Sequence, residues 1–189
     1  DYGLIFDLSV YEQKVDGRPR MDAVRTMLPD LTPEEQIHAG DTKQGYYMDM
    51  LNAGMLSLFE TSMIFIRELL AKGIRIVGAS SSRNAPFILE KIGLLDDFEG
   101  VVSGADIQHG NPAPDIFLKA AEILQLPVKH CIVFEDAKSG VQAAKAGGFY
   151  CVGIDRHNRK EHFLKADLVV ADLAQVNYDL LANALKTTD

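Results

Sequence analysis

Tryptophan is absent from this sequence of 189 residues, and cysteine occurs only twice, at Cys131 and Cys151. Two cysteines cannot form the dense disulfide framework of a small secreted domain, and each lies in an apolar, strand-like run. We therefore expect two reduced thiols in the core of a cytoplasmic protein. The chain also lacks any apolar run near the roughly 20 residues that a membrane-spanning helix needs, so no membrane span is expected.

Basic residues are in the minority, because 19 Lys and Arg face 27 Asp and Glu and give a net charge of -8. A chain of this charge repels the phosphates of nucleic acids and of anionic lipids, so neither is expected as a partner. Apolar residues make up 47% of the chain. This composition and length suit one core domain with a small accessory one, and we expect a monomer or a weak dimer.

The chain does contain short apolar runs that end in polar residues. The three clearest runs are residues 131–134 before Glu135 and Asp136, 74–79 before Ser80, and 3–6 before Asp7. Apolar runs without alternation are typical of strands buried on both faces of a parallel sheet. Because parallel strands end at one edge of their sheet, we expect Asp7, Ser80, Glu135 and Asp136 to share one small volume.

Strands and helices alternate along most of the chain. Further strands are expected at 100–103, 150–154 and 168–170, and helices at 61–72, 85–92, 115–124, 139–146 and 178–185. Between the first two strands only helical spacing occurs, at 21–28 and 33–58, and Thr32-Pro33 is a clear helix start. The pattern predicts an α/β fold with a doubly wound (Rossmann-like) parallel sheet in 1–8 and 62–189, and a helical cap domain in 9–61.

Oxygen ligands gathered around a small site are typical of Mg²⁺, which often takes substrate phosphate into its coordination shell. Asp7 is the candidate nucleophile, since a carboxylate can accept a phosphoryl group and divide one displacement into two steps. The hydroxyls of residues 80–82 could bind an anion, with Arg83 and Asn84 beside them. Plainer interpretations remain: Asp136 as a helix cap, Glu135 in solvent, and the serines as an ordinary helix start.

These segments resemble the haloacid dehalogenase-like hydrolase superfamily in order and spacing. The resemblance rests on IFDL at 5–8, ASSSRN at 79–84, NPAPDIF at 111–117 and FEDAKSGVQAAKAGG at 134–148. Within the superfamily, GRPRMDAV at 17–24 and TKQGYY at 42–47 resemble the cap of the β-phosphoglucomutase group.

The resemblance implies a role for each matched residue, and Mg²⁺ as the cofactor. Asp7 would be nucleophile and metal ligand, Glu135 and Asp136 further metal ligands, and Ser80 the phosphate-binding hydroxyl. Asn111 would stand in the catalytic position that precedes the proline motif. The other phosphate of a small sugar phosphate would be held by Arg20, Lys43, Ser81, Ser82, Arg83 and Asn84.

The sequence departs from the family pattern at two positions. Ser9 stands where the family has a second aspartate as general acid/base, and a serine cannot carry that proton at neutral pH. Asn111 stands where the family has a lysine, so one positive charge is missing from the site; Lys138 could replace it only by turning inward. The interval from Asp7 to Ser80 is also short, so we hypothesise that a segment is missing between Leu8 and Ser9.

Three functions are compatible with these residues. The first is a Mg²⁺-dependent mutase or phosphatase that acts on a small sugar phosphate through an aspartyl phosphate. The second is an impaired relative that binds phosphorylated ligands without turnover, which Ser9 and Asn111 favour. The third, a phospho-acceptor signalling domain, is disfavoured because such a domain has no need of a cap.

Overall fold

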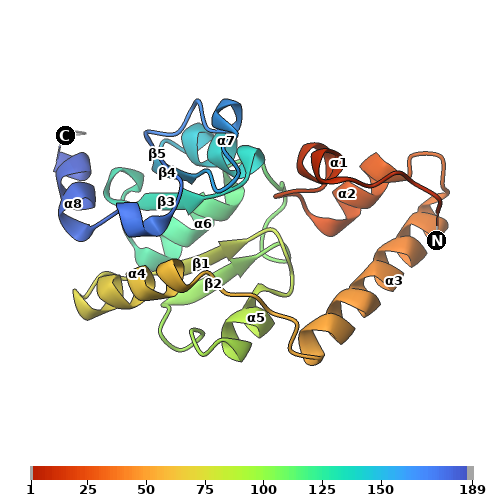
Figure 1. Cartoon of the computed structure of the whole chain (residues 1–189), viewed down its shortest axis with the longest axis horizontal. Coiled ribbons are helices and arrows are strands. Elements are labelled where there is room, and N and C mark those ends of the chain that lie inside the picture. Colours follow the sequence, from red (N-terminus) through yellow and green to blue (C-terminus); the bar gives the residue numbers. More distant parts are fainter. Residues whose placement is uncertain (1, 187–189) are drawn as a thin grey trace.

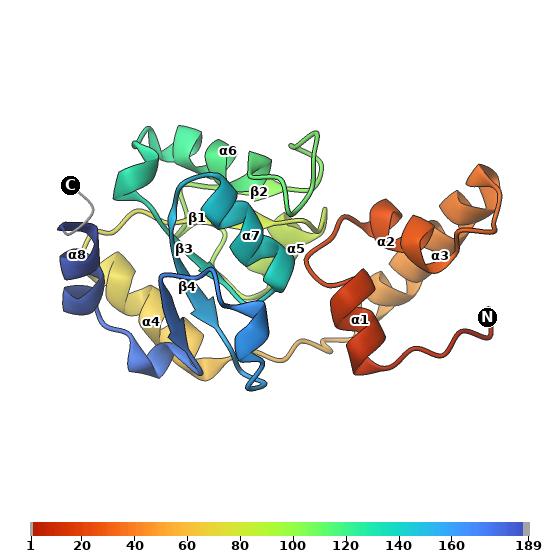
Figure 2. The same cartoon turned by 90° about the horizontal axis from the view of Figure 1, so that it is seen from above.

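The computed structural model describes residues 2–186, which form a helical lobe and an α/β lobe joined by the linker 53–59 (Figure 1). The helical lobe contains α1 (Leu8–Lys14), α2 (Arg20–Met27) and α3 (Pro33–Asn52). Seen from above, these three helices lie together at one end of the molecule (Figure 2). Helix α3 begins as the sequence predicts, since Thr32 and Glu35 form a reciprocal capping box and Pro33 occupies the first turn.

The α/β lobe alternates helices and strands, and every strand pair in the described chain is parallel. Its strands are β1 (Val77–Ser80), β2 (Gly100–Ser103), β3 (Ile132–Glu135), β4 (Tyr150–Ile154) and β5 (Leu168–Val170). Its helices are α4 (Glu60–Ala71), α5 (Ala85–Lys91), α6 (Asp115–Leu124), α7 (Lys138–Ala146) and α8 (Tyr178–Lys186). Short 3₁₀ turns lie at Val128–His130, Lys160–His162 and Leu173–Gln175. The predicted fold class, a parallel α/β core with a helical cap, is confirmed.

The strands of the described chain form two sheets, with the orders β1-β2 and β3-β4-β5. Within each sheet the register is regular, so that Val77 lies opposite Gly100 and Ile132 opposite Tyr150. Strands β1 and β3 do not pair with each other, although both end at the same pocket. In keeping with this separation, Ala79 of β1 is exposed and Phe134 of β3 only half-buried, whereas strands inside a continuous parallel sheet are covered on both faces.

The expected first strand at residues 3–7 is not formed, and this prediction was wrong. Leu4, Ile5 and Phe6 are exposed by 48%, 86% and 56%. Asp7 is the N-cap of α1 and accepts a hydrogen bond from the Val10 amide at 2.8 Å. An apolar run becomes a strand only where neighbouring strands form hydrogen bonds with its backbone N–H and C=O groups. Here the run ends in the N-cap of a helix and does not form a strand.

The hypothesis of a missing segment between Leu8 and Ser9 stays a prediction. Helix α1 runs through this bond without interruption, and the Tyr11 amide donates to the Asp7 carbonyl at 3.0 Å across it. The predicted helix at 33–58 is shorter than expected, because α3 ends at Asn52 and the linker follows.

The core consists of two clusters on either side of the β3-β4-β5 sheet. One packs α6 and α7 around Val102, Ile116, Val141 and Cys151, and the other packs α4 and α8 around Phe65, Val152, Ile154 and Leu181. Cys131 and Cys151 are buried free thiols, as predicted. None of the helices within residues 2–186 has the length and apolar character to cross a membrane.

Gly104 directly follows β2, and a Cβ atom at this position would overlap the carbonyl oxygen of Ser81. Gly104→Ala is therefore expected to lower the free energy of unfolding by about 2–3 kcal/mol, because backbone must move to make room. Urea denaturation of the purified variant measures this loss. Gly45→Ala is the matched control: this glycine lies inside α3 with open space around it, and there alanine should stabilise by up to about 1 kcal/mol.

Candidate active site

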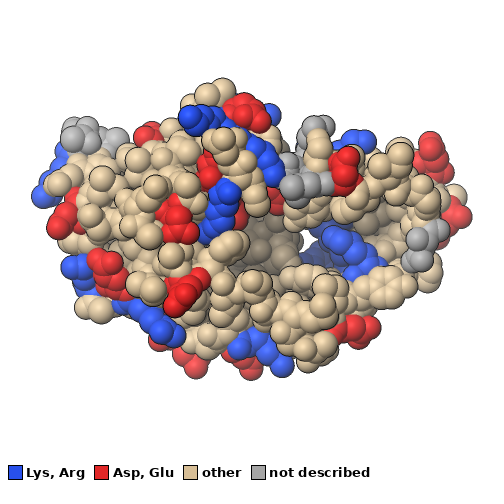
Figure 3. Space-filling model, in the orientation of Figure 1, with Lys and Arg blue, Asp and Glu red and all other residues tan. Residues whose placement is uncertain are grey.

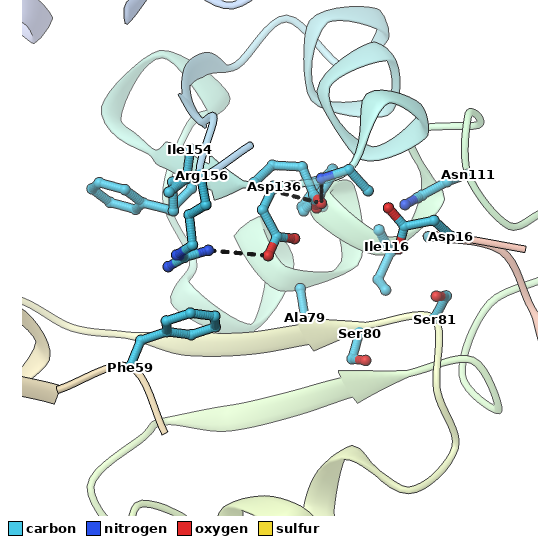
Figure 4. A pocket seen from close by; sticks show the side chains of 15 residues that line it. Asp16, Phe59, Ala79, Ser80, Ser81, Asn111, Ile116, Asp136, Ile154 and Arg156 are labelled. Carbon is cyan, nitrogen blue, oxygen red and sulfur yellow. Dashed lines mark hydrogen bonds and ion pairs between the residues drawn. The ribbon is translucent and has the colours of Figure 1, made fainter. Parts of the chain in front are cut away.

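A pocket of about 390 Å³ lies where β1 and β3 end, beside the helical lobe (Figure 4). Its polar lining combines side chains from both lobes: Asp16, Ser80, Ser81, Asn111, Glu135, Asp136 and Arg156. In the space-filling view the molecule is hollowed between the lobes, with basic side chains on the helical side of the hollow (Figure 3). The pocket therefore offers acids, hydroxyls, an amide and a guanidinium to one small ligand.

Glu135, the last residue of β3, and Asp136 directly after it form a pair of adjacent acids. The Glu135 Oε1 atom accepts hydrogen bonds from the Asp136 and Ala137 amides at 3.1 and 2.8 Å. Gly140 lies so close to this carboxyl group that a Cβ atom would overlap it. Burial, and then the charge of Asp136, raises the pKa of Glu135 to about 8. Two carboxylates held this close repel each other, which favours a proton or a cation between them.

The serine loop after β1 is ordered by its own side chains. Ser80 Oγ accepts a hydrogen bond from the Ser82 amide, and Ser82 Oγ accepts one from the Asn84 amide, both at 3.2 Å. Ser80 and Ser81 line the pocket, whereas Ser82, Arg83 and Asn84 do not. Asn84 instead exchanges two side-chain hydrogen bonds with Gln44 of α3, at 2.7 and 3.2 Å, and so joins the two lobes.

Asn111 enters the pocket from the loop before α6. Its Oδ1 atom is buried and has no hydrogen-bond partner among the described residues. An orphaned acceptor of this kind is costly unless a ligand or a cation satisfies it. Lys138, which could have supplied the missing positive charge, is exposed at the start of α7 and outside the pocket lining.

Asp16, which was not among the residues predicted from the sequence, reaches the pocket from the turn between α1 and α2. Its backbone carbonyl accepts a hydrogen bond from Ser139 at 3.3 Å, and burial followed by the charge of Asp136 raises its pKa. Gly17 has φ +66° and lies against Ser139, so this turn favours glycine. The Asp16-Gly17 pair is a turn signal that could have identified this corner.

Arg156 was also missed. It follows β4 and lies with its guanidinium 3.8 Å above the Phe59 ring, and it forms an ion pair with Asp136 at 3.2 Å. The signal was its place after a buried parallel strand, the same rule that selected Glu135 and Asp136.

Arg20 and Lys43 lie near each other in the helical lobe, outside the pocket lining. Arg20 forms an ion pair with Asp41 at 3.4 Å. Burial, and then the positive charge of Arg20, lowers the pKa of Lys43. The structure thus groups these two cations, but neither lines the pocket with Ser80, Glu135 and Asp136.

Asp7 is not brought to the pocket, which corrects the expected gathering of Asp7 with Asp136. Its carboxylate instead accepts the hydrogen bond that caps α1, because the segment that carries Asp7 does not enter the sheet. Ser80, Ser81, Asn111, Glu135 and Asp136 do come together in one pocket.

Because Asp7 caps a short helix, Asp7→Ala is expected to destabilise α1 by about 1 kcal/mol and to leave Mg²⁺ affinity unchanged. Hydrogen exchange of the α1 amides measures the first effect, and calorimetric titration with MgCl₂ the second. Asp7→Asn is the control, since asparagine caps a helix about as well as aspartate. A clear loss of Mg²⁺ affinity in Asp7→Ala would contradict this assignment.

The residues present fit a divalent cation. Within residues 2–186, no three His, Cys, Asp or Glu side chains are arranged around a common metal position. Mg²⁺ does not require such a group, because it keeps several waters and uses one or two carboxylates with substrate phosphate. Glu135, Asp136 and the unsatisfied Asn111 Oδ1 supply oxygen donors of this type.

Residues 10–148 match the family of haloacid dehalogenase-like hydrolases, which covers well over half of the chain. The chain belongs to this family. The matched region begins at residue 10, after Asp7. The likeness that IFDL suggested at residues 5–8 therefore lies outside the family match.

The relatives of this haloacid dehalogenase-like hydrolase include β-phosphoglucomutases. The chain is 40% identical over 110 residues to that of Bacillus subtilis, with 58% of the chain and about half (47%) of the relative covered. It is 34% identical to that of Mycobacterium tuberculosis, with 88% of the chain and 72% of the relative covered. The predicted family, its β-phosphoglucomutase-like group and the enzyme class, a hydrolase or phosphomutase, are confirmed.

Solved structures show the same fold. A β-phosphoglucomutase from Clostridium difficile superposes with a TM-score of 0.88 at 23% identity, covering 98% of this chain and 85% of that one. An archaeal β-phosphoglucomutase from Pyrococcus gives 0.74 at 26% identity, covering 100% and 88%. The chain thus shares its overall fold with solved structures of this group.

Proposed function

We propose that the pocket binds Mg²⁺ and the phosphoryl group of a small sugar phosphate, for transfer through an aspartyl phosphate. The observation that carries the proposal is the convergence of Ser80, Asn111, Glu135 and Asp136 in one pocket. The related β-phosphoglucomutases support a sugar phosphate as substrate, acted on by mutase or phosphatase chemistry.

Each residue of the pocket would have a separate task. Glu135 and Asp136 would hold Mg²⁺, which supplies positive charge to the phosphoryl oxygens. Ser80 and Ser81 would donate hydroxyl hydrogen bonds to those oxygens, and the Asn111 amide a further one. Because Asn111 carries no charge, its position brings no cation to the phosphoryl oxygens, and removing one such transition-state donor typically costs about 10²–10³ in rate.

The cap lobe would bind the rest of the substrate. We propose a core of residues 62–189 and a cap of 9–61, with residues 1–8 no longer assigned to the sheet. Arg20 and Lys43, which lie together in the cap, would contact the non-transferring phosphate when the lobes approach, together with Ser82, Arg83 and Asn84. A cytoplasmic location and a monomer or weak dimer remain part of the proposal.

A second candidate is a family member that binds phosphorylated ligands without turnover. The position of Asp7 favours it, because the nucleophile would have to leave the α1 cap and enter the pocket. Ser9 in place of the acid/base and Asn111 in place of lysine favour it as well.

Turnover of a panel of sugar phosphates with MgCl₂, compared between the wild type and Asp7→Asn, separates the two candidates. Phosphoryl transfer requires a carboxylate nucleophile, so turnover lost in Asp7→Asn supports transfer through Asp7. Mg²⁺-dependent binding with equal or no turnover in both proteins supports the binding role. Absence of Mg²⁺-dependent binding of any sugar phosphate by the wild type would refute both.

A further inference from the structure

Arg156 connects the acidic side of the pocket to the linker between the lobes. One guanidinium nitrogen donates to Asp136 Oδ2 at 3.2 Å, and another donates to Ser62 Oγ at 3.3 Å. The guanidinium carbon Cζ lies 3.8 Å from the centroid of the Phe59 ring. Figure 4 shows the labelled Arg156 and Phe59 side chains one above the other. The Arg156 side chain is only 15% exposed. Three contacts therefore hold the largely buried Arg156 guanidinium in place.

These contacts belong to two regions far apart in the sequence. Phe59 is the last residue of the linker and the N-cap of α4, and Ser62 lies in the first turn of that helix. Asp136 lies at the end of β3, on the loop that holds the proposed cation site. The Arg156 guanidinium thus ties the position where the chain enters the α/β lobe to a carboxylate of the pocket.

The three contacts depend on one another. The Asp136 side chain is 62% exposed and Phe59 is 56% exposed, and contacts with this much solvent access contribute little stability singly. The ion pair, the stacking on Phe59 and the hydrogen bond to Ser62 therefore fix the guanidinium only in combination. A divalent cation that takes the Asp136 carboxylate would remove one of these contacts and bring a second positive charge close to the guanidinium.

We propose that Arg156 is a positioning residue that couples cation binding at Asp136 to the mobility of the linker 53–59. Without a cation, Arg156 holds the linker end and Asp136 at the same time. With a cation on Asp136, Arg156 loses its ion pair, and its stacking on Phe59 and its hydrogen bond to Ser62 weaken. The linker then becomes more mobile, which allows the two lobes to move relative to each other. The inference depends on the cation site of the proposed function.

The test uses the full chain and MgCl₂ alone, without substrate. Hydrogen exchange of peptides that cover residues 53–62 reports the linker, and calorimetric titration reports Mg²⁺ affinity. The variants are Arg156→Gln, which removes the charge, and Arg156→Lys, which keeps the charge but loses the planar fork and its stacking. Arg75→Gln is the matched control, because Arg75 forms a partly exposed ion pair with Glu99 at 3.4 Å outside the pocket lining.

In the wild type and in Arg75→Gln, saturating Mg²⁺ is expected to raise linker exchange several-fold. In Arg156→Gln the exchange should be raised without Mg²⁺ and should no longer respond to it. Mg²⁺ should then bind roughly twofold to fivefold more tightly, the gain expected when a weak competing ion pair is removed. Arg156→Lys should loosen the linker while its Mg²⁺ affinity stays near that of the wild type.

Two results would overturn the proposed coupling and leave the proposed function intact. One is Mg²⁺ binding to the wild type with no change in linker exchange, and the other is an Arg156→Gln linker that behaves like the wild type. If the wild type binds no Mg²⁺ at all, the cation site of the proposed function fails as well, and the titration identifies that case directly.

Discussion

Replacing Asp136 by asparagine is expected to weaken Mg²⁺ binding at least about 100-fold and to abolish Mg²⁺-dependent binding of sugar phosphates. Asparagine keeps the size of the side chain but removes the negative charge beside Glu135. Replacing residues that merely support a metal ligand already costs about 10–100-fold in metal affinity, so loss of a ligating carboxylate should cost more. Titration calorimetry with MgCl₂ measures the effect.

Asp96→Asn is the matched control for this substitution. Asp96 is an exposed acid on the loop before β2 and does not line the pocket, so this change should leave Mg²⁺ affinity within twofold of the wild type, or about 0.4 kcal/mol. Equal affinities in Asp136→Asn and the control would show that the acidic pair is not the cation site.

Without metal, the protein is expected to lose stability as the pH rises from about 5 to 8. The pKa of Glu135 is raised to about 8 from an ordinary value of 4.5, so the folded state binds this proton more tightly than the unfolded chain does. The stabilisation is complete below the unfolded pKa and disappears as the pH passes the folded one. The loss should be on the order of 3 kcal/mol across this range.

Urea denaturation at a series of pH values, in the presence of EDTA, tests this expectation. Glu135→Gln removes the titrating group and should flatten most of the pH dependence. Addition of Mg²⁺ at pH 8 should restore stability in the wild type and not in Glu135→Gln, because a cation favours the ionised carboxylate. A wild-type stability that is independent of pH from 5 to 8 would contradict the buried, protonated state of Glu135.

Much of the α/β lobe could be predicted from the sequence. The apolar runs at 131–134 and 150–154 form most of the parallel strands β3 and β4, and Glu135 and Asp136 come at the end of the first run and line the pocket, as expected. The Thr32 cap and Pro33 also fixed the start of α3. A helix start depends on residues adjacent in the chain, and a buried strand depends on a continuous apolar run. Both patterns can be recognised in the sequence.

The sequence by itself determined the local elements, the acids at the end of β3 and the serines at the end of β1. Only the tertiary structure decided which polar residues meet. The apolar run before Asp7 resembles a strand as closely as 132–135 does, yet it finds no strand beside it and ends as a helix cap. Asp16 and Arg156 reach the pocket from segments with no catalytic pattern of their own. A strand needs hydrogen-bonding partners and a pocket needs several chain segments, and both are supplied by residues distant in the sequence.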